Sequence, residues 1–381
     1  MARLGDIFTI TSGGTPDKKK SEYYANGTIP WVKTGDLKNQ YVQTGIECIT
    51  EEGLNNSSAK LFPPNTVLVA MYGATIGACS ILPYEASTNQ ACAAFLPNEK
   101  VMPTYLYYFL SSKKEQFIKD GVGGAQPNIS AGYLKNVHFD LIPMQQQNNM
   151  VRTLDKVSEL IALRKEQLAK LDRLVKSRFI ELFEGSNYPF EPLDNNVIEM
   201  FIGPFGSSLK NEVFVDEEDG FCMVYEQKHA IQKTMDVPTR YVPKSKYEEL
   251  KRFTILGGDI IVSCRGTIGE IFVVPNDAPM GIMHPSIMKI RLNTEKYNQK
   301  FFVFALEQYM DEHSAEAKGS GVKMAVSATV LGQSDFVIPP IDVQDQFAAF
   351  VEQTDKSKLA IQQCLDKLEL LKKSLMQEYF G

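Results

Sequence analysis

The chain has 381 residues, more than one domain usually contains, which predicts two or three separately folded units. Hydrophobic residues make up 44% and charged residues 23%, and no run of about 18 apolar residues occurs, so we expect a globular protein and no membrane partner. The formal net charge of −6 argues against a chain that holds nucleic acid unaided, because phosphate contacts need Lys and Arg.

The sequence gives no sign of a metal or cofactor. Its six cysteines form no C-x-x-C pair and its first residues lack the apolar core of a secretory signal, so we expect reduced thiols and a cytoplasmic location. No phosphate-binding G-x-x-x-x-G-K-[ST] string occurs, so no nucleotide cofactor is expected. His284, with Pro285, is interpreted as a turn. The histidines lie far apart without zinc-site spacing: His138, His229, His284 and His313.

In chain order, the first predicted unit covers residues 1–140. A β-branched run at 66–69, bounded by Pro, Asn and Gly, predicts a strand, and a helix is expected near 105–119. The segment carries twelve Lys and Arg against twelve Asp and Glu. It is therefore predicted to be an electrically balanced, mixed α/β globule.

The segment 141–184 is predicted to form a long helix that starts just after Pro143, because no later Pro or Gly interrupts it. Its apolar residues alternate at spacings of four and three, as in a coiled coil. Arg164 and Arg178 break this pattern. The predicted packing residues are Leu154, Val157, Ile161, Leu168, Leu171, Val175 and Leu182.

A second globule is predicted over 185–336, with strands at 260–262 and 271–274 and a helix near 300–313. A second long helix is predicted over 337–381. Helices of this length need a partner, so we expect the two to pair, in antiparallel directions. The alternative is that each packs only on its own globule. Packing residues of the second helix are Val351, Ile361, Leu365, Leu368 and Leu375.

The two halves of the sequence repeat each other. At a shift of 197, residues 124–183 match 321–380 at 15 of 60 positions, including Pro143 with Pro340 and Gln147 with Gln344. Upstream, residues 69–77 parallel 261–269 at a shift of 192. One repeat of this length predicts duplicated domains and not a solenoid. Two copies suggest a ligand with two parts.

The order of globule, long helix, globule and long helix resembles the specificity subunit of type I restriction-modification systems. Single motifs are weak, but their order and repetition are specific, and the resemblance covers essentially the whole chain. The first half supplies residues 12–16 (SGGTP), 29–37 (IPWVKTGDL), 124–130 (GAQPNIS) and 143–147 (PMQQQ). The second supplies residues 224–230 (VYEQKHA), 266–269 (GTIG) and 340–344 (PIDVQ).

The resemblance implies a non-catalytic DNA-recognition subunit. Residues 1–140 and 185–336 would be target-recognition domains, each reading half of a split site in double-stranded DNA. Segments 141–184 and 337–381 would act as spacer helices that dock two methyltransferase subunits, and restriction/translocase subunits would complete the complex. Because the acidic residues gather in the second half of the chain, partners would supply much of the phosphate neutralisation.

Base identity is read by polar side chains, with Arg or Lys suited to guanine and Asn or Gln to adenine. The lysine run at 18–20 is equally compatible with phosphate contacts that position the protein without specifying sequence. In the first half the candidate DNA-binding residues are Lys18, Lys19, Lys20, Lys33, Thr34, Tyr72, Gln126 and Asn128. In the second half they are Ser207, Ser208, Lys210, Gln227, Lys228, Arg265 and Lys323.

Two other classes of function stay open at this point. The acidic charge favours a helical scaffold without a DNA role. An enzyme is the third class, but an adenine methyltransferase in this setting would carry Asn or Asp before Pro-Pro and an aromatic residue. The Pro-Pro pairs at 63–64 and 339–340 follow Phe62 and Ile338 instead.

Overall fold

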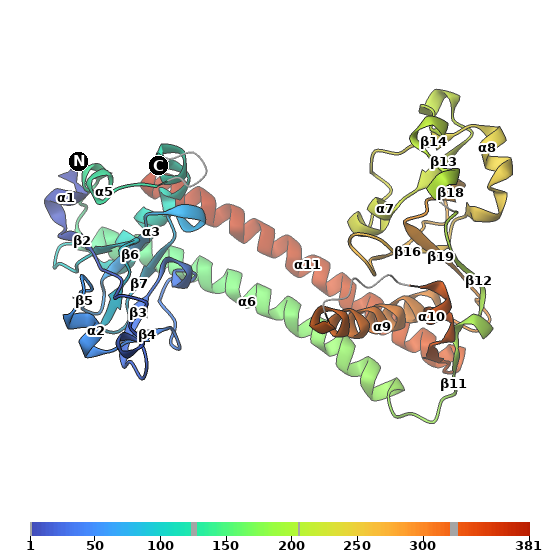
Figure 1. Ribbon diagram of the computed structural model, residues 1–381, viewed down its shortest axis with the longest axis horizontal. Coiled ribbons are helices and arrows are strands. Elements are labelled where there is room, and N and C mark those ends of the chain that lie inside the picture. The colour runs from blue at the N-terminus through green and yellow to red at the C-terminus, as the bar shows by residue number, and fades with distance from the viewer. Residues whose placement is uncertain (1, 123–127, 205, 321–326) are drawn as a thin grey trace. The chain divides into compact units, whose positions relative to one another are not determined.

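The computed structural model describes residues 2–122, 128–204, 206–320 and 327–381. The chain divides into two compact units, of which unit 1 comprises Met1–Gln167 and Ile361–Gly381 and unit 2 comprises Leu168–Ala360. Each unit contains a globule and the adjoining ends of two long helices, α6 (Met144–Phe183) and α11 (Ile341–Phe380) (Figure 1). The expected mixed α/β class, with two sheet-containing domains joined by a long helix, is confirmed.

Unit 1 is built on two four-stranded sheets with strand orders β2-β9-β6-β7 and β4-β3-β8-β5, and β1 pairs with β10. Its strands are β1 (Ala2–Arg3), β2 (Ile10–Ser12), β3 (Ile29–Val32), β4 (Cys48–Ile49), β5 (Leu61–Phe62), β6 (Val67–Ala70), β7 (Cys79–Ile81), β8 (Ala86–Thr88), β9 (Cys92–Phe95) and β10 (His138–Phe139). Its shorter helices are α1 (Leu4–Ile7), α2 (Glu51–Asn55), α3 (Pro103–Ser112), α4 (Lys114–Asp120) and α5 (Ala131–Asn136).

Unit 2 repeats this topology strand for strand, with sheet orders β12-β19-β16-β17 and β14-β13-β18-β15 and the pair β11-β20. Its strands are β11 (Phe190–Pro192), β12 (Val197–Ile202), β13 (Cys222–Tyr225), β14 (Tyr241–Val242), β15 (Thr254–Ile255), β16 (Ile260–Ser263), β17 (Ile271–Val273), β18 (Gly281–Met283), β19 (Ile287–Leu292) and β20 (Asp335–Val337). Its shorter helices are α7 (Gln227–Gln232), α8 (Lys244–Glu249), α9 (Gln299–Ser320) and α10 (Ala328–Gln333). The internal repeat in the sequence is thus a duplicated fold.

Strand β6 shows how each unit is layered. Successive side chains of a strand point to opposite faces. Val67 and Val69 join the apolar cluster made with α3 and the long helices, whereas Leu68 and Ala70 join the cluster between the two sheets. Both faces of the central sheet are therefore buried, which explains why this strand is an uninterrupted apolar run.

A buried glutamine fixes the start of each long helix. Gln147 accepts a hydrogen bond from Met102 N at 2.9 Å and donates to the carbonyls of Lys100 and Ile142, both at 2.9 Å. Gln344 makes the same three contacts in unit 2, to Asn298 N and to the carbonyls of residues 296 and 339. Because a buried polar group is costly unless it is hydrogen-bonded, these side chains lock each long helix to the loop before α3 or α9.

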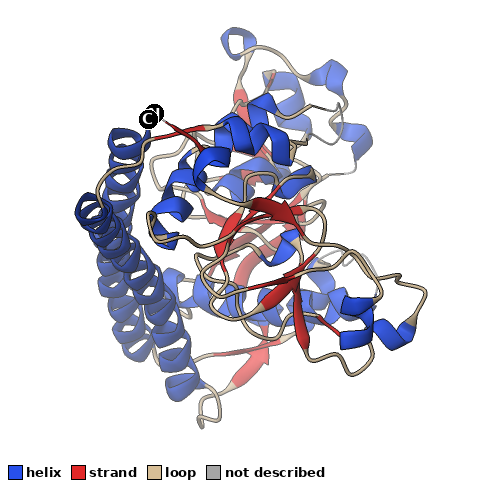
Figure 2. Ribbon diagram, turned by 90° about the vertical axis from the view of Figure 1, so that its left-hand side faces the viewer, coloured by secondary structure: helices blue, strands red, loops and turns tan. Residues whose placement is uncertain are grey.

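Within each unit, the segments of the two long helices lie side by side in opposite directions (Figures 1 and 2). In unit 2, Asp172 Oδ1 pairs with Lys358 Nζ at 2.7 Å, while Phe183, further along α6, packs against Phe347, nearer the start of α11. In unit 1, Lys165 Nζ contacts Glu369 Oε1 at 2.8 Å. Residue numbers rise on one helix as they fall on the other, which is the antiparallel pairing expected.

All of the packing residues predicted for the two long helices are buried or half-buried. Phe179 and Phe183, which the seven-residue pattern omitted, are also buried in unit 2. The buried members of the predicted set are Leu154, Val157, Val175 and Leu365. The half-buried members are Ile161, Leu168, Leu171, Leu182, Val351, Ile361, Leu368 and Leu375.

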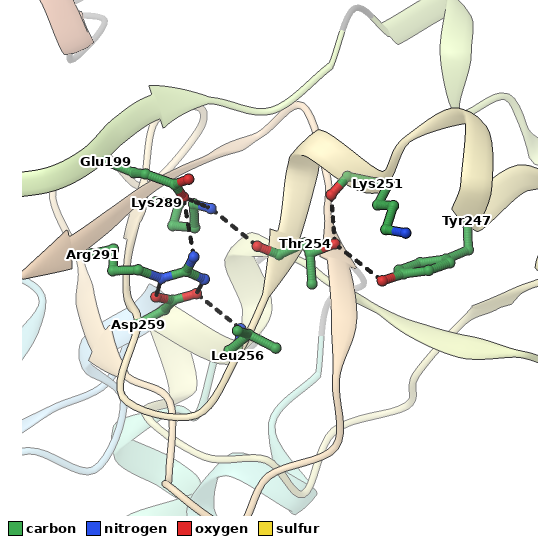
Figure 3. Close-up of polar contacts among 8 residues, drawn as sticks. All are labelled: Glu199, Tyr247, Lys251, Thr254, Leu256, Asp259, Lys289 and Arg291. Atoms are coloured by element: carbon green, nitrogen blue, oxygen red, sulfur yellow. Dashed lines mark hydrogen bonds and ion pairs between the residues drawn. The ribbon is translucent and has the colours of Figure 1, made fainter.

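Unit 2 carries an ion-pair network where unit 1 is apolar (Figure 3). Lys289 on β19 is 1% exposed, and its Nζ donates to Glu199 Oε2 at 2.5 Å and to the Thr254 carbonyl at 3.1 Å. Arg291 donates two hydrogen bonds to Asp259, each at 2.7 Å. The network ties the two sheets of unit 2 together, since Thr254 belongs to β15 of the second sheet. In unit 1 the strand position equivalent to Lys289 is Ala94, within an apolar cluster.

Across the described ranges, none of the helices combines the length and apolar character needed to span a bilayer.

Candidate nucleic-acid interface

Four loops of unit 1 are gathered at one edge of its sheets. Asn89 N donates to the Val32 carbonyl at 3.0 Å, so the loops after β8 and β3 adjoin. Met71 N donates to the carbonyl of Ala91 at 2.9 Å, which places the loop after β6 beside the loop after β8. Gly14 N donates to the carbonyl of Thr88, the last residue of β8, which brings the loop after β2 to the same edge. We call residues 13–16, 33–36, 71–77 and 89–91 the loop edge of unit 1.

Unit 2 forms the same edge through equivalent backbone bonds. His284 N donates to the Tyr225 carbonyl at 2.9 Å, and Cys264 N donates to the Ser286 carbonyl at 2.8 Å. The amide of Gln227 lies within 4 Å of the position a side chain at Gly266 would take. Residues 203–204, 226–229, 264–269 and 284–286 form the loop edge of unit 2.

Tyr72 and Arg265 occupy matching positions in the turn after the central strand. Each precedes a glycine with positive φ, +67° at Gly73 and +68° at Gly266, where other residues are strained. Tyr72 is 44% exposed and forms an isolated β-bridge with Asn128. The structure therefore places Tyr72 and the exposed Arg265 at equivalent positions of the two loop edges, with Asn128 bridged to Tyr72.

Two side-chain hydrogen bonds hold the loop that leads into the three lysines. Trp31 Nε1 donates to the Gly14 carbonyl at 3.0 Å, and Tyr24 Oη donates to the Pro16 carbonyl at 2.6 Å. Lys18 and Lys19 follow on the surface with exposed side chains, whereas Lys20 Nζ donates to Tyr23 Oη at 2.8 Å. That hydrogen bond raises the pKa of Lys20. The run supplies cations beside the edge, which suits phosphate contact.

The two edges carry one ion pair with its charges exchanged. In unit 1, Lys33 Nζ contacts Glu47 Oε2 at 2.6 Å, and in unit 2 Glu226 pairs with Arg240. The positions correspond because of equivalent backbone hydrogen bonds. Trp31 N on β3 donates to the Glu47 carbonyl, and Val224 N on β13 donates to the Arg240 carbonyl. Lys33 therefore aligns with Glu226, and Thr34 aligns with Gln227.

Glu226 also binds Lys228 at 2.7 Å, so it holds two cations of unit 2. Burial alone would raise its pKa, but hydrogen bonds from Lys228 and Arg240 keep the pKa of Glu226 below its ordinary value. Arg240 additionally lies over the ring of Phe214, with Cζ at 3.9 Å from the centroid. The carboxylate stays ionised and orients both cations.

Other predicted residues lie elsewhere or beyond what is described. Ser208 and Lys210 lie in and after a short 3-10 helix, Gly206–Ser208, and within the described ranges neither bonds to the loop edge. Only the backbone of Ser207 is described. Gln126 and Lys323 fall outside the described residues.

Two edge residues were missed by sequence reasoning, namely Asn89 and His284. Both directly follow a short buried strand and occupy equivalent positions. The segments around them, 88–92 and 283–287, share no identity, so the repeat gave no signal, and His284 was interpreted only as part of a turn. A search for polar residues at the ends of matched strands would have found both.

A groove lies at an equivalent place in each unit, where α3 or α9 meets the long helices. The groove of unit 1 has a volume of about 700 Å³ and that of unit 2 about 780 Å³. Lys176 lines the second and Lys373 the first, and these two lysines correspond in the repeat. The grooves differ in charge, since Lys113, Lys114 and Lys372 also line the first, whereas acidic residues are as frequent as basic ones in the second.

Among the described residues, no three His, Cys, Asp or Glu side chains are grouped so as to hold a metal ion. The arrangement offers instead hydrogen-bond donors, cations and one aromatic side chain on loops held by two rigid sheets.

Comparisons with known proteins agree with this geometry. The sequence pattern of a family described as "Type I restriction modification DNA specificity domain" matches residues 1–173 and 220–372. The MjaIX type I restriction enzyme specificity subunit of Methanocaldococcus jannaschii is 31% identical over 200 residues, which are 51% of this chain and 45% of that protein. The EcoR124I/EcoR124II specificity subunit of Escherichia coli is 28% identical over 162 residues, 41% of this chain and 40% of that one. The chain thus spans less than half the length of these relatives.

Solved structures show the same fold over the full chain. A chain from a structural study of the assembly and conformational transition of the type I R-M system superposes with a TM-score of 0.67 at 16% identity, covering 100% of this chain and 96% of that one. The type I restriction-modification S subunit from M. genitalium superposes with a TM-score of 0.51 at 16% identity, covering 100% and 95%.

Proposed function

This chain belongs to the type I restriction modification DNA specificity family, and from that premise we propose that it reads a two-part site in double-stranded DNA without altering it chemically. The observation that carries the proposal is the duplicated loop edge. The same four loops meet in each unit, but they present Tyr72 and Thr34 in one and Arg265 and Gln227 in the other. One scaffold with two sets of side chains suits a site whose halves differ in sequence.

The proposed contacts follow from side-chain chemistry. In unit 2, Arg265 is a donor-only group suited to guanine and Gln227 suits adenine, whereas Lys228 is held by Glu226. In unit 1, Asn128 offers an amide and Tyr72 a hydroxyl, while Lys18 and Lys19 suit phosphates. Lys33 and Glu226 serve instead to position their loops, because each is bound within its own ion pair.

We expect the purified chain, mixed with its methyltransferase subunit, to direct methylation of adenine to a two-part site with an unread spacer. The measurement is sequencing of methylated bases on a plasmid library with and without this chain. If the methyltransferase subunit alone methylates that same site, the proposal is wrong. Absence of duplex binding even with that subunit present would favour the helical scaffold. Binding of S-adenosylmethionine by the chain alone would favour an enzyme.

The two equivalent grooves support docking of two methyltransferase subunits, one on each unit. A fold that repeats a surface twice offers two copies of one partner the same contact. Each groove combines an apolar floor, such as Val303 and Phe304 in unit 2, with a charged rim, as interfaces between subunits do. The restriction/translocase subunits would then join the complex of this chain with the methyltransferase.

Lys176→Glu and Lys373→Glu are each expected to remove one docked methyltransferase subunit, because a carboxylate replaces a rim cation that faces the partner. Native mass spectrometry would count the subunits, with two on the unaltered chain, one on each single variant and none on the double variant. Lys156→Glu and Lys367→Glu make the same charge change at exposed helix positions outside the grooves and should keep two. Two subunits on the double variant would contradict docking at the grooves.

A further inference from the structure

The two equivalent residues of the loop edges, Asn89 and His284, are locked through their acceptor atoms. Asn89 Oδ1 accepts the Ala91 N–H at 3.2 Å. His284 Nδ1 accepts the Ser286 N–H, also at 3.2 Å, and lies 2.7 Å from Ser286 Oγ. Two different side chains therefore make the same bond to the backbone two residues ahead.

This bond decides what each side chain can offer to a ligand. With Nδ1 of His284 acting as acceptor, the proton of the neutral ring is on Nε2, which is a donor. With Oδ1 of Asn89 occupied, its remaining group is the Nδ2 amide, again a donor. Within the residues that the structure describes, neither donor has a hydrogen-bond partner, and both side chains are half-buried, so each donor is held in place.

The surroundings of His284 keep its ring neutral. Burial is the main cause that lowers its pKa, and Arg240, Arg265 and Lys228 lower it further, against an opposing effect of Glu226. Those cations also lack acceptors. The centre of this loop edge is therefore dominated by donors.

We propose that Asn89 and His284 are specificity-determining residues that each donate to a guanine, one in each half of the DNA site, an assignment that rests on the proposed function. Guanine presents two acceptors, N7 and O6, in the major groove. An unconstrained asparagine pairs with adenine by donating to N7 and accepting from N6. In Asn89 the oxygen already accepts the Ala91 N–H, so Nδ2 is the group free to make the contact. A fixed donor also disfavours cytosine, whose N4 group is itself a donor.

Asn89→Asp tests this in unit 1, because it keeps an oxygen for Ala91 N–H and replaces the free donor by an acceptor of the same shape. The complex of the full chain with its methyltransferase subunit is bound to duplexes randomised over both half-sites, and bound sequences are counted. At one position of one half-site, the guanine preference should fall by roughly 5- to 150-fold and move toward cytosine, which donates to carboxylates. The other half-site should be unchanged.

His284→Asp should produce the same inversion in the other half-site. His284→Asn, which installs the residue found in unit 1, should retain guanine because it keeps both the acceptor for Ser286 N–H and a free donor. Asn148→Asp makes the same chemical change as Asn89→Asp at an exposed position of α6 and should leave every preference intact.

The outcomes separate the two levels of the hypothesis. If the unaltered complex shows sequence preference and the Asp variants keep guanine at every position, or lose affinity equally for all sequences, this assignment is overturned while the proposed function stands. If the preference that the Asp variants lose is for thymine and not for guanine, the assignment is also overturned, because the donor would then contact thymine O4. If the unaltered complex shows no preference, the proposed function fails and the assignment with it.

Discussion

Asp259→Ala is expected to lower the free energy of unfolding by about 3 kcal/mol, because it removes the main partner of Arg291, a cation whose side chain is only 27% exposed. Asp259 is 2% exposed and accepts two hydrogen bonds from Arg291 and one from Leu256 N at 2.8 Å (Figure 3). Without it, Arg291 keeps only a 3.3 Å contact to Glu199, and a backbone N–H loses its acceptor. Urea unfolding followed by circular dichroism measures the change.

The matched control is Asp277→Ala, which removes an exposed carboxylate of the same unit and should change stability by less than about 0.5 kcal/mol. The chain has one tryptophan, Trp31, buried in unit 1. The urea midpoint followed by Trp31 fluorescence should shift less than the midpoint followed by circular dichroism, since the substitution lies in unit 2. Equal stability of the two alanine variants would show that the network contributes nothing.

The same network makes unit 2 sensitive to acid. The hydrogen bond from Lys289 is the main cause that holds the pKa of Glu199 below its ordinary value. A carboxylate whose folded pKa is lowered contributes stability above its unfolded pKa, and that contribution is lost as the pH falls through the folded pKa. Glu199 is partly exposed, so its share is small, and the unaltered chain should lose a modest part of its free energy of unfolding as the pH falls through that range.

The repeated and periodic parts of the fold were predictable from the sequence. Long stretches without Pro or Gly, with apolar residues at spacings of four and three, indicated both long helices, and apolar runs located β6 and β16. Helix boundaries were less accurate. The helix expected at 105–119 is divided into α3 and α4 at Lys113, whose backbone, with ψ of 3°, leaves the helical range.

The pairing of strands could not be predicted, because it depends on contacts between distant segments. The parallel pair β3-β8 brings Val32 beside Thr88, and only this pairing places Asn89 next to the loop of Lys33. The charge-exchanged ion pairs could not be predicted for the same reason. Lys33 was expected to contact bases, whereas the fold gives it a carboxylate partner, Glu47, fourteen residues away.

The site itself was predicted in part, and its base contacts stay a prediction. Tyr72 and Arg265 were among the polar residues proposed from the sequence, and the structure holds both at the loop edges. The orientation of Asn89 and His284 depends on bonds to backbone amides that no composition or spacing encodes. Such local capping is visible only once the loops are placed.

The most direct test of the central claim, that each unit reads its own half of the site, is to exchange residues 1–140 for the same segment of a relative with another specificity. The exchange point falls between β10 and α6, so the core of unit 1 moves with the segment while the long helices are retained. The methylated bases of a host that carries the exchanged chain and its methyltransferase subunit are then sequenced. Our account predicts that one half of the recognised site changes completely and the other half is untouched. A change in both halves, or in neither while methylation persists, would contradict independent reading by the two units.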